Sequence, residues 1–226
     1  MPSSLASAAH RVASWFFLPG AAACGLLARI LFSARVEGVE HVPRTGPFVL
    51  VANHCSNLDP PIIGWAAGKK VGRIIHFMAK DEMRSWPLAG WLAQQSAVIF
   101  VRRGEADRAA QKAALDTLAD GRPIALFIEG TRSRDGHLKV GRGGAAFLAM
   151  RSGAPLLPVA ISGTHRIFPG SSRWPHPTKV VVRIGEPFSL GHVADGRLDR
   201  EALAAGTERI MATIEGMLPP EQRRVP

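Results

Sequence analysis

Three short clusters of polar residues each follow an apolar run in this sequence. They read Asn-His-Cys-Ser-Asn-Leu-Asp at 53–59, Arg-Arg-Gly at 102–104 and Glu-Gly-Thr-Arg-Ser at 129–133. If the apolar runs are neighbouring parallel strands, their carboxyl ends meet at one edge of a sheet, where α/β proteins bind ligands. The sequence therefore predicts that the three clusters line a common cleft.

His54 and Asp59 are the pair with a recognisable chemistry, and they are five residues apart. On one continuous helix this spacing corresponds to a rotation of about 500°, so the two side chains would not share a face. If His54 lies on a loop and Asp59 near the start of the next helix, the carboxylate can accept the imidazole Nδ1–H and leave Nε2 free. Such a pair acts as a general base on a hydroxyl group. A structural histidine beside a helix-capping aspartate is the simpler alternative.

The other two clusters suit the binding of a phosphate group. The forked guanidinium groups of Arg103 and Arg132 match phosphate geometry. Gly130 allows the backbone to approach a ligand closely, and Thr131 and Ser133 supply hydroxyl donors. We therefore expect these residues to bind a phosphorylated substrate, with a solvated surface charge as the alternative for Arg103.

Glu129 is unusual in a phosphate site, because a bare carboxylate repels phosphate. We expect it to orient an arginine or to accept a hydrogen bond from a glycerol hydroxyl. A metal site built from Glu129, His76 and the His–Asp pair has no standard ligand spacing, so no metal ion is expected. The stretch 139–144 resembles a phosphate-binding loop, but it lacks the Walker spacing.

The elements that must position these clusters are predicted from an alternation of apolar runs and helical segments. Strands buried on both faces are nearly continuous in apolar residues, many of them β-branched. Runs of this kind occupy residues 47–52, 74–79, 97–101, 123–128, 155–161 and 179–184. Helices are expected at about 60–67, 87–95, 105–120, 143–152 and 199–217. The alternation predicts one α/β domain over residues 36–226, with a predominantly parallel or mixed sheet flanked by helices.

Residues 1–35 contain an apolar stretch of 17 residues without a charge, and a Pro-Gly pair interrupts it. Because proline breaks a helix, we expect two short helices at about 8–18 and 21–33. The stretch is at the lower limit of what crosses a bilayer. We therefore predict an apolar helical hairpin that associates with the membrane, in one leaflet or at the interface. A buried helix of the core and a cleaved export signal are the alternatives.

The formal net charge of +10 favours an anionic partner such as nucleic acid, a membrane surface or a phosphorylated substrate. The sequence has neither a basic helix with interleaved aromatic residues nor a zinc-finger spacing, so no nucleic-acid partner is expected. A hydrophobic fraction of 46% and a charged fraction of 20% exclude a disordered chain. Cys24 and Cys55 lie in unlike segments, so a disulfide is not expected and a reducing compartment fits best.

Four motifs in order resemble those of the 1-acylglycerol-3-phosphate acyltransferase family, within the wider glycerolipid acyltransferases. An Asn-His followed by four residues and Asp is complete at 53–59, and Glu-Gly-Thr-Arg-Ser is intact at 129–133. The second motif reads AVIFVRR at 97–103, and the fourth reads PVAI at 158–161. The resemblance extends over roughly residues 36–190.

Three positions depart from the family pattern. Ala97 replaces the usual Gly of the second motif, although Phe100 and Arg103 fit it. Ile128 stands where Pro is common before the Glu, and this change is expected to relax the loop without removing a reactive group. Arg102 stands where Asp is frequent, and an effect on substrate preference is expected.

The resemblance implies an O-acyltransferase of phospholipid biosynthesis. A hydroxyl of lysophosphatidate, or of a related lysophospholipid, then attacks the thioester of acyl-CoA or acyl carrier protein directly. It implies that His54 is the general base and Asp59 its partner, while Arg103 and the Glu-Gly-Thr-Arg-Ser motif hold the acceptor's phosphate and glycerol. No cofactor is needed beyond the acyl donor. The implied place is the cytoplasmic face of a membrane with an anionic surface, which is the inner membrane in a bacterium.

Two other functions remain open on the sequence. Cys55 next to His54 is compatible with an acyl-thioester hydrolase or a ping-pong acyltransferase that uses a Cys–His pair, although adjacent residues rarely face each other. A non-catalytic, basic lipid- or membrane-binding module explains the net charge and the apolar N-terminal stretch. That module leaves the polar clusters without a role.

Overall fold

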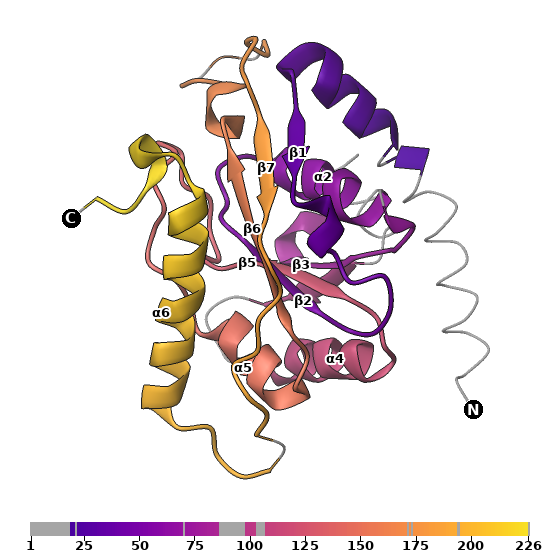
Figure 1. Cartoon of the computed structure of the whole chain (residues 1–226), viewed down its shortest axis with the longest axis vertical. Helices are drawn as coiled ribbons and strands as arrows, with labels where there is room; N and C mark the ends of the chain where they lie inside the picture. Colours follow the sequence, from indigo (N-terminus) through magenta and orange to yellow (C-terminus); the bar gives the residue numbers. More distant parts are fainter. Residues whose placement is uncertain are drawn as a thin grey trace.

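A seven-stranded mixed sheet forms the centre of the described structure, with the strand order β1-β7-β6-β2-β5-β3-β4 (Figure 1). The structure is a computed structural model, and it describes residues 19–225 except 21, 70, 86–97, 103–106, 171, 173 and 194. Helices cover both faces of the sheet. This architecture confirms the predicted α/β fold with a central sheet flanked by helices.

Six strands correspond to the six apolar runs. They are β2 (Val49–Ala52), β3 (His76–Lys80), β4 (Val98–Val101), β5 (Ile124–Phe127), β6 (Leu156–Ser162) and β7 (Val181–Ile184). The strands β6, β2, β5, β3 and β4 are parallel to one another, whereas β7 is antiparallel to β6. Of the two predicted alternatives, the sheet is therefore the mixed one.

The seventh strand, β1 (Arg35–Glu37), does not follow from the sequence pattern. It pairs in parallel with β7 at the edge of the sheet. It has three residues, and only Val36 is partly buried, so it produces no apolar run. The predicted boundary between residues 35 and 36 falls inside this strand.

Four helices agree with predicted segments: α2 (Asp59–Ile63), α4 (Arg108–Ala119), α5 (Gly144–Ser152) and α6 (Arg200–Met217). α2 continues into a π-helical turn, η2 (Gly64–Lys69). Residues 22–32 form a further helix, which agrees with the helix predicted at about 21–33. Short 3-10 helices occur at η1 (Val39–His41), η3 (Asp81–Ser85), η4 (Thr164–Arg166) and η5 (Pro220–Gln222). The predicted helices at 8–18 and 87–95 lie outside the described residues.

The ends of these helices follow from local sequence. The side chains of Asp107 and Asp199 accept hydrogen bonds from the first turns of α4 and α6, as helix caps do. α5 ends at Gly153, whose φ of 69° favours glycine. α2 begins with Asp59 followed by two prolines, which suit a first helical turn because it needs no backbone N–H donors.

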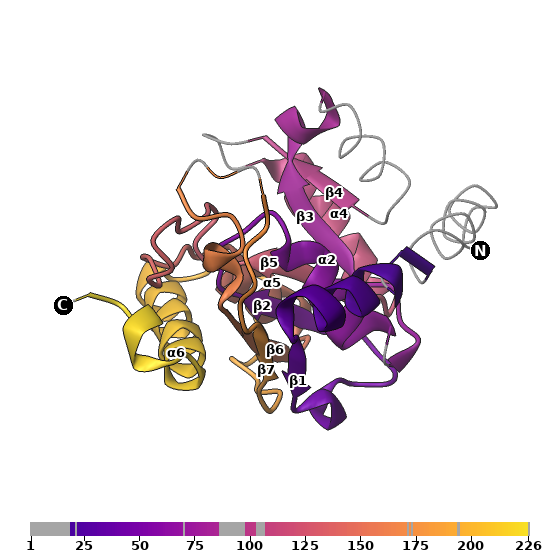
Figure 2. The ribbon, with the colours of Figure 1, turned by 90° about the horizontal axis from the view of Figure 1, so that it is seen from above.

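The side chains of the buried strands alternate between two cores. On β2, Leu50 and Ala52 pack with α2 and the helix at 22–32, whereas Val49 and Val51 pack with α4, α5 and α6. Figure 2 shows α2 and α6 on opposite sides of the sheet. Burial on both faces explains why β2 consists of apolar residues alone.

The helix at 22–32 has one face in the core and one exposed face. Ala28 and Phe32 are buried. Gly25 lies so close to the indole of Trp65 that a Cβ on Gly25 would come within 2.1 Å of it. On the opposite face, four large apolar side chains are between 49% and 68% exposed: Leu26, Leu27, Ile30 and Leu31. No helix within the described residues is both long and apolar enough to cross a membrane.

Replacing Gly25 by Ala is expected to lower the melting temperature, because the added methyl group displaces Trp65 and overpacking costs about 1–3 kcal/mol. The same change raises helix propensity by about 1 kcal/mol, which offsets only part of this cost. Gly216→Ala on α6 is the matched control, because nothing lies within 4 Å of a Cβ there. Thermal unfolding compares the two variants, and a Gly25→Ala protein as stable as Gly216→Ala would contradict the tight packing.

Candidate active site

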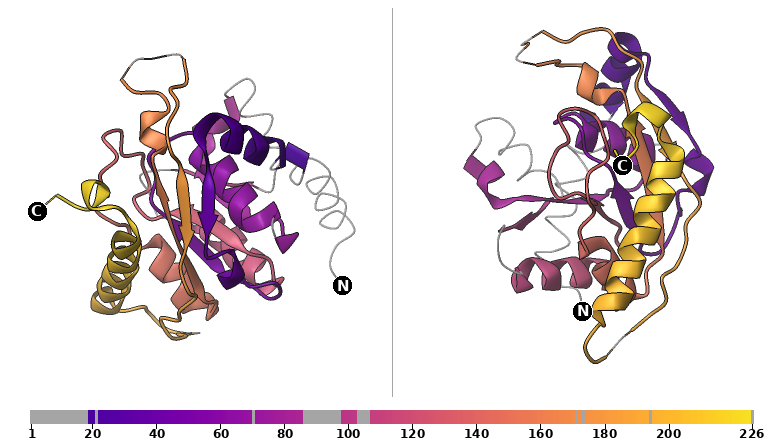
Figure 3. Two further views of the ribbon diagram at one scale, coloured as in Figure 1. Left: turned by 45° about the horizontal axis from the view of Figure 1, so that its top comes forward. Right: turned by 90° about the vertical axis from the view of Figure 1, so that its left-hand side faces the viewer.

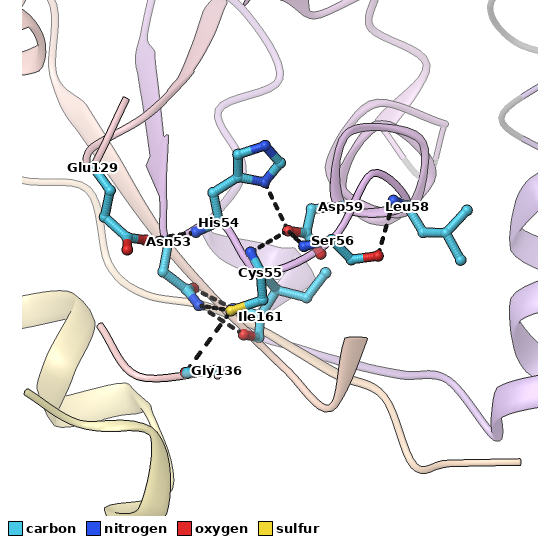
Figure 4. A network of polar contacts seen from close by, with 9 residues as sticks. All are labelled: Asn53, His54, Cys55, Ser56, Leu58, Asp59, Glu129, Gly136 and Ile161. Atoms are coloured by element: carbon cyan, nitrogen blue, oxygen red, sulfur yellow. Dashed lines mark hydrogen bonds and ion pairs between the residues drawn. The ribbon is translucent and has the colours of Figure 1, made fainter. Parts of the chain in front are cut away.

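The carboxyl ends of β2 and β5 are adjacent, and they bring two of the three polar clusters together. Asn53 directly follows β2, and its side-chain amide forms two hydrogen bonds with the backbone of Ile161 on β6. Asn53 Oδ1 accepts from the Ile161 N–H at 2.8 Å, and Asn53 Nδ2 donates to the Ile161 carbonyl at 2.9 Å. The amide thus continues the pairing of β2 with β6 and fixes where His54 leaves the sheet (Figure 4).

His54 lies on the loop after β2, Asp59 lies at the start of α2, and the two side chains are hydrogen-bonded. The distance from His54 Nδ1 to Asp59 Oδ2 is 2.8 Å. An ionised carboxylate only accepts hydrogen bonds, so Nδ1 carries the proton and Nε2 is the free nitrogen. The Asp59 side chain is fully buried, whereas the His54 side chain is 16% exposed. The pair therefore combines a buried orienting carboxylate with an accessible imidazole.

The same Asp59 oxygen also accepts two backbone hydrogen bonds. The N–H groups of Cys55 and Ser56 donate to Oδ2 at 2.6 and 2.7 Å. The other oxygen, Oδ1, is buried and has no hydrogen-bond partner among the described residues. Oδ2 thus holds both the loop and the imidazole, and the two N–H donors stabilise its negative charge.

The imidazole of His54 stacks on Phe127, the last residue of β5. The ring centroids are 3.9 Å apart and the ring planes differ by 14°. With one edge bound to Asp59 and one face covered by Phe127, the ring is held in one orientation. The sequence gives no chemical signal for Phe127, and only its place at the end of a strand, just before the Glu-Gly-Thr-Arg-Ser motif, points to the site.

Glu129 is buried, with an exposed fraction of 2%, and both of its carboxylate oxygens accept backbone hydrogen bonds. Oε1 accepts from the His54 N–H at 2.8 Å, and Oε2 accepts from the Lys139 N–H at 3.0 Å. Burial raises the pKa of Glu129 to about 7, and the two N–H donors and the Lys139 charge oppose only part of that rise. Glu129 therefore fixes the backbone of His54 through the His54 N–H.

Ser133 contacts the next peptide unit, the one that contains the His54 carbonyl. Its N–H donates to the His54 carbonyl at 2.7 Å. Its side chain is fully buried, and the hydroxyl donates to Asp135 at 2.6 Å. The Ser133 hydroxyl thus stabilises the loop and is not presented on the surface.

The middle of the Glu-Gly-Thr-Arg-Ser motif is the part that reaches the surface. Gly130 has a φ of 63°, and a Cβ there would come within 2.9 Å of the Arg142 side chain, so this turn requires glycine. Thr131 is exposed, and Arg132 is partly exposed. These two side chains are therefore the ones that can contact a ligand.

The third polar cluster follows β4, an edge strand of the sheet. β3 lies between β4 and β5, so this cluster is not adjacent to the other two in strand order. Arg102 is exposed, and its N–H donates to Asp107 at 2.9 Å. Arg103 lies outside the described residues, and its part in the site stays a prediction.

Cys55 is buried, and its sulfur points away from the imidazole of the preceding residue (Figure 4). The sulfur lies 3.5 Å from Asn53 Nδ2 and 3.9 Å from the Gly136 carbonyl. Burial, together with the charges of Asp59 and Glu129, raises the pKa of the thiol. A raised pKa disfavours the thiolate that a cysteine nucleophile requires. The geometry therefore gives no support to a Cys–His pair.

His76 begins β3, so it lies at the amino edge of the parallel strands, opposite His54. Its Nδ1 faces the Pro123 carbonyl at 3.3 Å. Across the described ranges, no three His, Cys, Asp or Glu side chains form a group suited to a metal ion. His76 therefore does not complete the metal site considered from the sequence.

The sequence profile of the Acyltransferase family matches residues 33–162, which is more than half of the chain. This chain belongs to the acyltransferase family. The segment matched contains both members of the His54–Asp59 pair and the Glu-Gly-Thr-Arg-Ser motif. The resemblance drawn from the four motifs is therefore confirmed.

Relatives of known activity include lipid acyltransferases. The lyso-ornithine lipid O-acyltransferase of Pseudomonas aeruginosa is 38% identical over 138 residues, which cover 61% of this chain and 50% of that protein. A chloroplastic 1-acyl-sn-glycerol-3-phosphate acyltransferase of Arabidopsis thaliana is 29% identical over 62% of this chain and 39% of that protein. The 1-acyl-sn-glycerol-3-phosphate acyltransferase alpha of Mus musculus is 31% identical over 84% and 66%. The chain thus spans half or less of the first two proteins.

A solved structure has the same fold. The crystal structure of PlsC, the 1-acyl-sn-glycerophosphate acyltransferase from Thermotoga maritima, superposes with a TM-score of 0.68 at 27% sequence identity. The match covers 90% of this chain and 79% of that chain. The mixed sheet with its flanking helices is therefore the fold of an acyltransferase.

The raised pKa of Glu129 predicts that stability falls as the pH rises from about 4.5 to about 7. In this range the folded protein keeps the Glu129 proton, whereas the unfolded chain, with a pKa of 4.5, releases it. Because the unfolded chain binds fewer protons, the free energy of unfolding decreases with rising pH. Glu129→Gln removes this titration, so the melting temperature of the variant is expected to depend less on pH.

Melting temperatures across this pH range, measured for the wild type and the variant, give the comparison. Glu186→Gln is the matched control, because Glu186 is exposed and forms no ion pair among the described residues. An equal pH dependence in wild type and Glu129→Gln would show that Glu129 does not titrate in this way.

Proposed function

We propose that this protein transfers a fatty acyl group from acyl-CoA or acyl carrier protein to a hydroxyl of lysophosphatidate or a related lysophospholipid. The observation that carries the proposal is the His54–Asp59 pair, whose free imidazole nitrogen belongs to a partly exposed ring at the carboxyl edge of the sheet. Membership of the acyltransferase family and the activities named for the relatives support the same reaction.

In the proposed reaction, His54 Nε2 takes the proton of the acceptor hydroxyl while the hydroxyl oxygen attacks the thioester carbonyl carbon. A C–O bond forms, and the carbonyl becomes a tetrahedral oxyanion. Collapse of this intermediate breaks the C–S bond, and the leaving thiolate takes the proton from the imidazolium. Asp59 stabilises the imidazolium and keeps the ring oriented. No acyl-enzyme forms, and the products are the acylated lipid and a free thiol.

The phosphate and glycerol of the acceptor are proposed to bind beside Thr131 and Arg132, with Arg103 as a further cation. The Arg132 guanidinium forms no ion pair within the described part of the chain, which leaves it available for an anion. Gly130 and Ser133 fix the conformation of the loop, and this conformation positions the side chains of Thr131 and Arg132. In this proposal no metal ion or prosthetic group takes part.

A lyso-ornithine lipid is the second candidate acceptor. The 38% identity to the P. aeruginosa lyso-ornithine lipid O-acyltransferase favours it. This lipid is built on an amino acid and has no phosphate group. An acceptor assay must therefore offer both lipids, because they place different demands on Arg132.

We further propose that residues 1–35 associate with the anionic, cytoplasmic face of a membrane, the inner membrane in a bacterium. The exposed apolar face of the helix at 22–32 supports this proposal, as does the net charge of +10. The buried face of the same helix attaches the element to the core. The acceptor's acyl chain lies in the same membrane, so this arrangement would place the site beside its substrate.

Purified protein in mild detergent is expected to release free thiol from acyl-CoA only when a suitable lysophospholipid is present. His54→Ala is expected to lower the rate by about 10²–10⁴-fold, the usual contribution of a general base. His192→Ala is the matched control. His192 lies beside Gly153, just before β6 begins, so it is at the amino ends of the parallel strands and His54 is at their carboxyl ends. Thiol release is measured with lysophosphatidate and with a lyso-ornithine lipid as separate acceptors.

Other outcomes of this assay separate the alternatives. Thiol release without an acceptor, or release unchanged in His54→Ala, would favour a thioester hydrolase that uses other residues. Transfer from acyl carrier protein alone would identify the donor. No transfer from either donor, with lipid binding that survives His54→Ala, would favour a non-catalytic lipid-binding module.

Cys55→Ala is expected to keep most of the transfer activity, because the sulfur is buried and contacts Asn53 and Gly136 instead of the imidazole. The variant also keeps the Cys55 N–H that donates to Asp59. The rate of thiol release and the melting temperature are measured together. Loss of transfer in a folded Cys55→Ala protein, or an acylated Cys55 found by mass spectrometry in the wild type, would restore the Cys–His alternative.

A further inference from the structure

Residues 218–225 follow α6 and are named here the C-terminal strap. Figure 3 shows the strap beside the loop that connects β5 with α5. Arg224 pairs with Glu208 and Glu215 of α6, at 2.7 Å in each case. The strap is therefore attached to α6 at one side and lies against a loop of the candidate site at the other.

Gln222 is the residue of the strap that enters the interior, with an exposed fraction of 3%. Its Oε1 accepts from the Gly163 N–H at 3.2 Å, and its Nε2 donates to the Gly136 carbonyl at 3.1 Å. Its own carbonyl accepts from the Leu138 N–H at 2.9 Å. One buried amide thus connects the loop after β5 with the turn after β6.

The contacts of Gln222 lie next to the groups that hold His54. Lys139, which follows Leu138, donates its N–H to Glu129, and Glu129 accepts the His54 N–H with its other oxygen. Gly136, the partner of the Gln222 amide, also contacts the Cys55 sulfur through its carbonyl. The path from the Gln222 carbonyl to the His54 N–H therefore consists of three hydrogen bonds, which the Leu138–Lys139 peptide bond and the Glu129 carboxylate connect.

We propose that Gln222 is a positioning residue of the site, whose amide holds loop 136–139 where Lys139 and Glu129 can fix the backbone of His54. The catalytic part of this inference rests on the proposed function, whereas the part about the loop does not. A glutamine suits the position because its amide donates and accepts at the same time. Without the amide, the buried Gly163 N–H has no partner and the Gly136 carbonyl keeps only its long contact with the Cys55 sulfur, so the loop must move to satisfy both groups.

Gln222→Met keeps the length and most of the volume of the side chain and removes both of its hydrogen bonds, so it tests the amide separately from packing. We expect kcat to fall about tenfold or more, because small displacements of reacting groups have large effects on rate. The KM of both substrates should stay unchanged, because Gln222 is buried. Gln111→Met, at a partly exposed position of α4, is the matched control.

Gln222→Glu tests the donor alone. Its carboxyl can always accept from the Gly163 N–H, but only the protonated form donates to the Gly136 carbonyl. The ratio of its kcat to that of the wild type should therefore rise as the pH is lowered. The neighbouring ionisable groups are Asp135 and His137 on the loop, His165 of η4 beside Gly136, and Arg223 on the strap. All of them are present in both proteins, so the ratio reports the new carboxyl.

Hydrogen exchange gives a readout that does not depend on activity. The amides of His54 and Lys139 both donate to Glu129. In Gln222→Met these two amides should exchange faster than in the wild type, whereas the amides of α4 should exchange at the same rate. This pattern distinguishes a local release of the loop from a general loss of stability.

The proposal is overturned by a folded Gln222→Met protein whose kcat is within about twofold of the wild type. Unchanged exchange at His54 and Lys139 overturns it as well, and so does faster exchange that includes α4. A higher KM at unchanged kcat overturns it too, by making Gln222 a substrate-binding residue. A wild type that transfers no acyl group refutes the proposed function, and hydrogen exchange then still decides whether Gln222 holds the loop.

Discussion

The buried carboxylate of Asp59 is the constraint on which the candidate site depends. One oxygen accepts hydrogen bonds from the His54 imidazole and from two successive backbone N–H groups. Because this carboxylate belongs to the first turn of α2, the position of the helix determines the orientation of the imidazole. The helix in turn is fixed by Ile62 and Ile63, which are buried in the core that also contains Leu50 and Ala52. Core packing and the geometry of the base are therefore coupled through one side chain.

The backbone of His54 is held by a second set of contacts, which come from the loop after a different strand. The loop after β5 supplies Glu129 to its N–H and Ser133 to its carbonyl. These contacts are possible because β2 and β5 are adjacent and parallel, so that the chain leaves both strands at the same edge. The ring is thus held by Asp59 of α2 and Phe127 of β5, and the N–H and carbonyl of His54 are held by the loop after β5. A general base requires an imidazole that is fixed in this way, because its free nitrogen must face the substrate hydroxyl in one orientation.

The sequence predicts those parts of the structure whose signals are local. Strands such as β2 are continuous apolar runs because both faces are buried, and His54 and Asp59 are close in sequence. β1 is not predictable in this way, because three residues at an edge carry no pattern. The contact of Asn53 with Ile161 spans 108 positions and that of Glu129 with His54 spans 75, and in both the partner is a backbone group. A backbone group carries no residue identity, so nothing in the sequence marks these contacts.

The reversal of direction at β7 has a consequence for the order in which the site is assembled. Since β7 is antiparallel to β6, the chain returns directly to the amino edge of the sheet, and α6 then runs back towards the carboxyl edge. Gln222 reaches the loop that carries Glu129 only by this route. On the ribosome, all seven strands of the described sheet are synthesised before Gln222. The nascent chain therefore contains every strand, the imidazole and both carboxylates before it contains the side chain that holds the loop after β5.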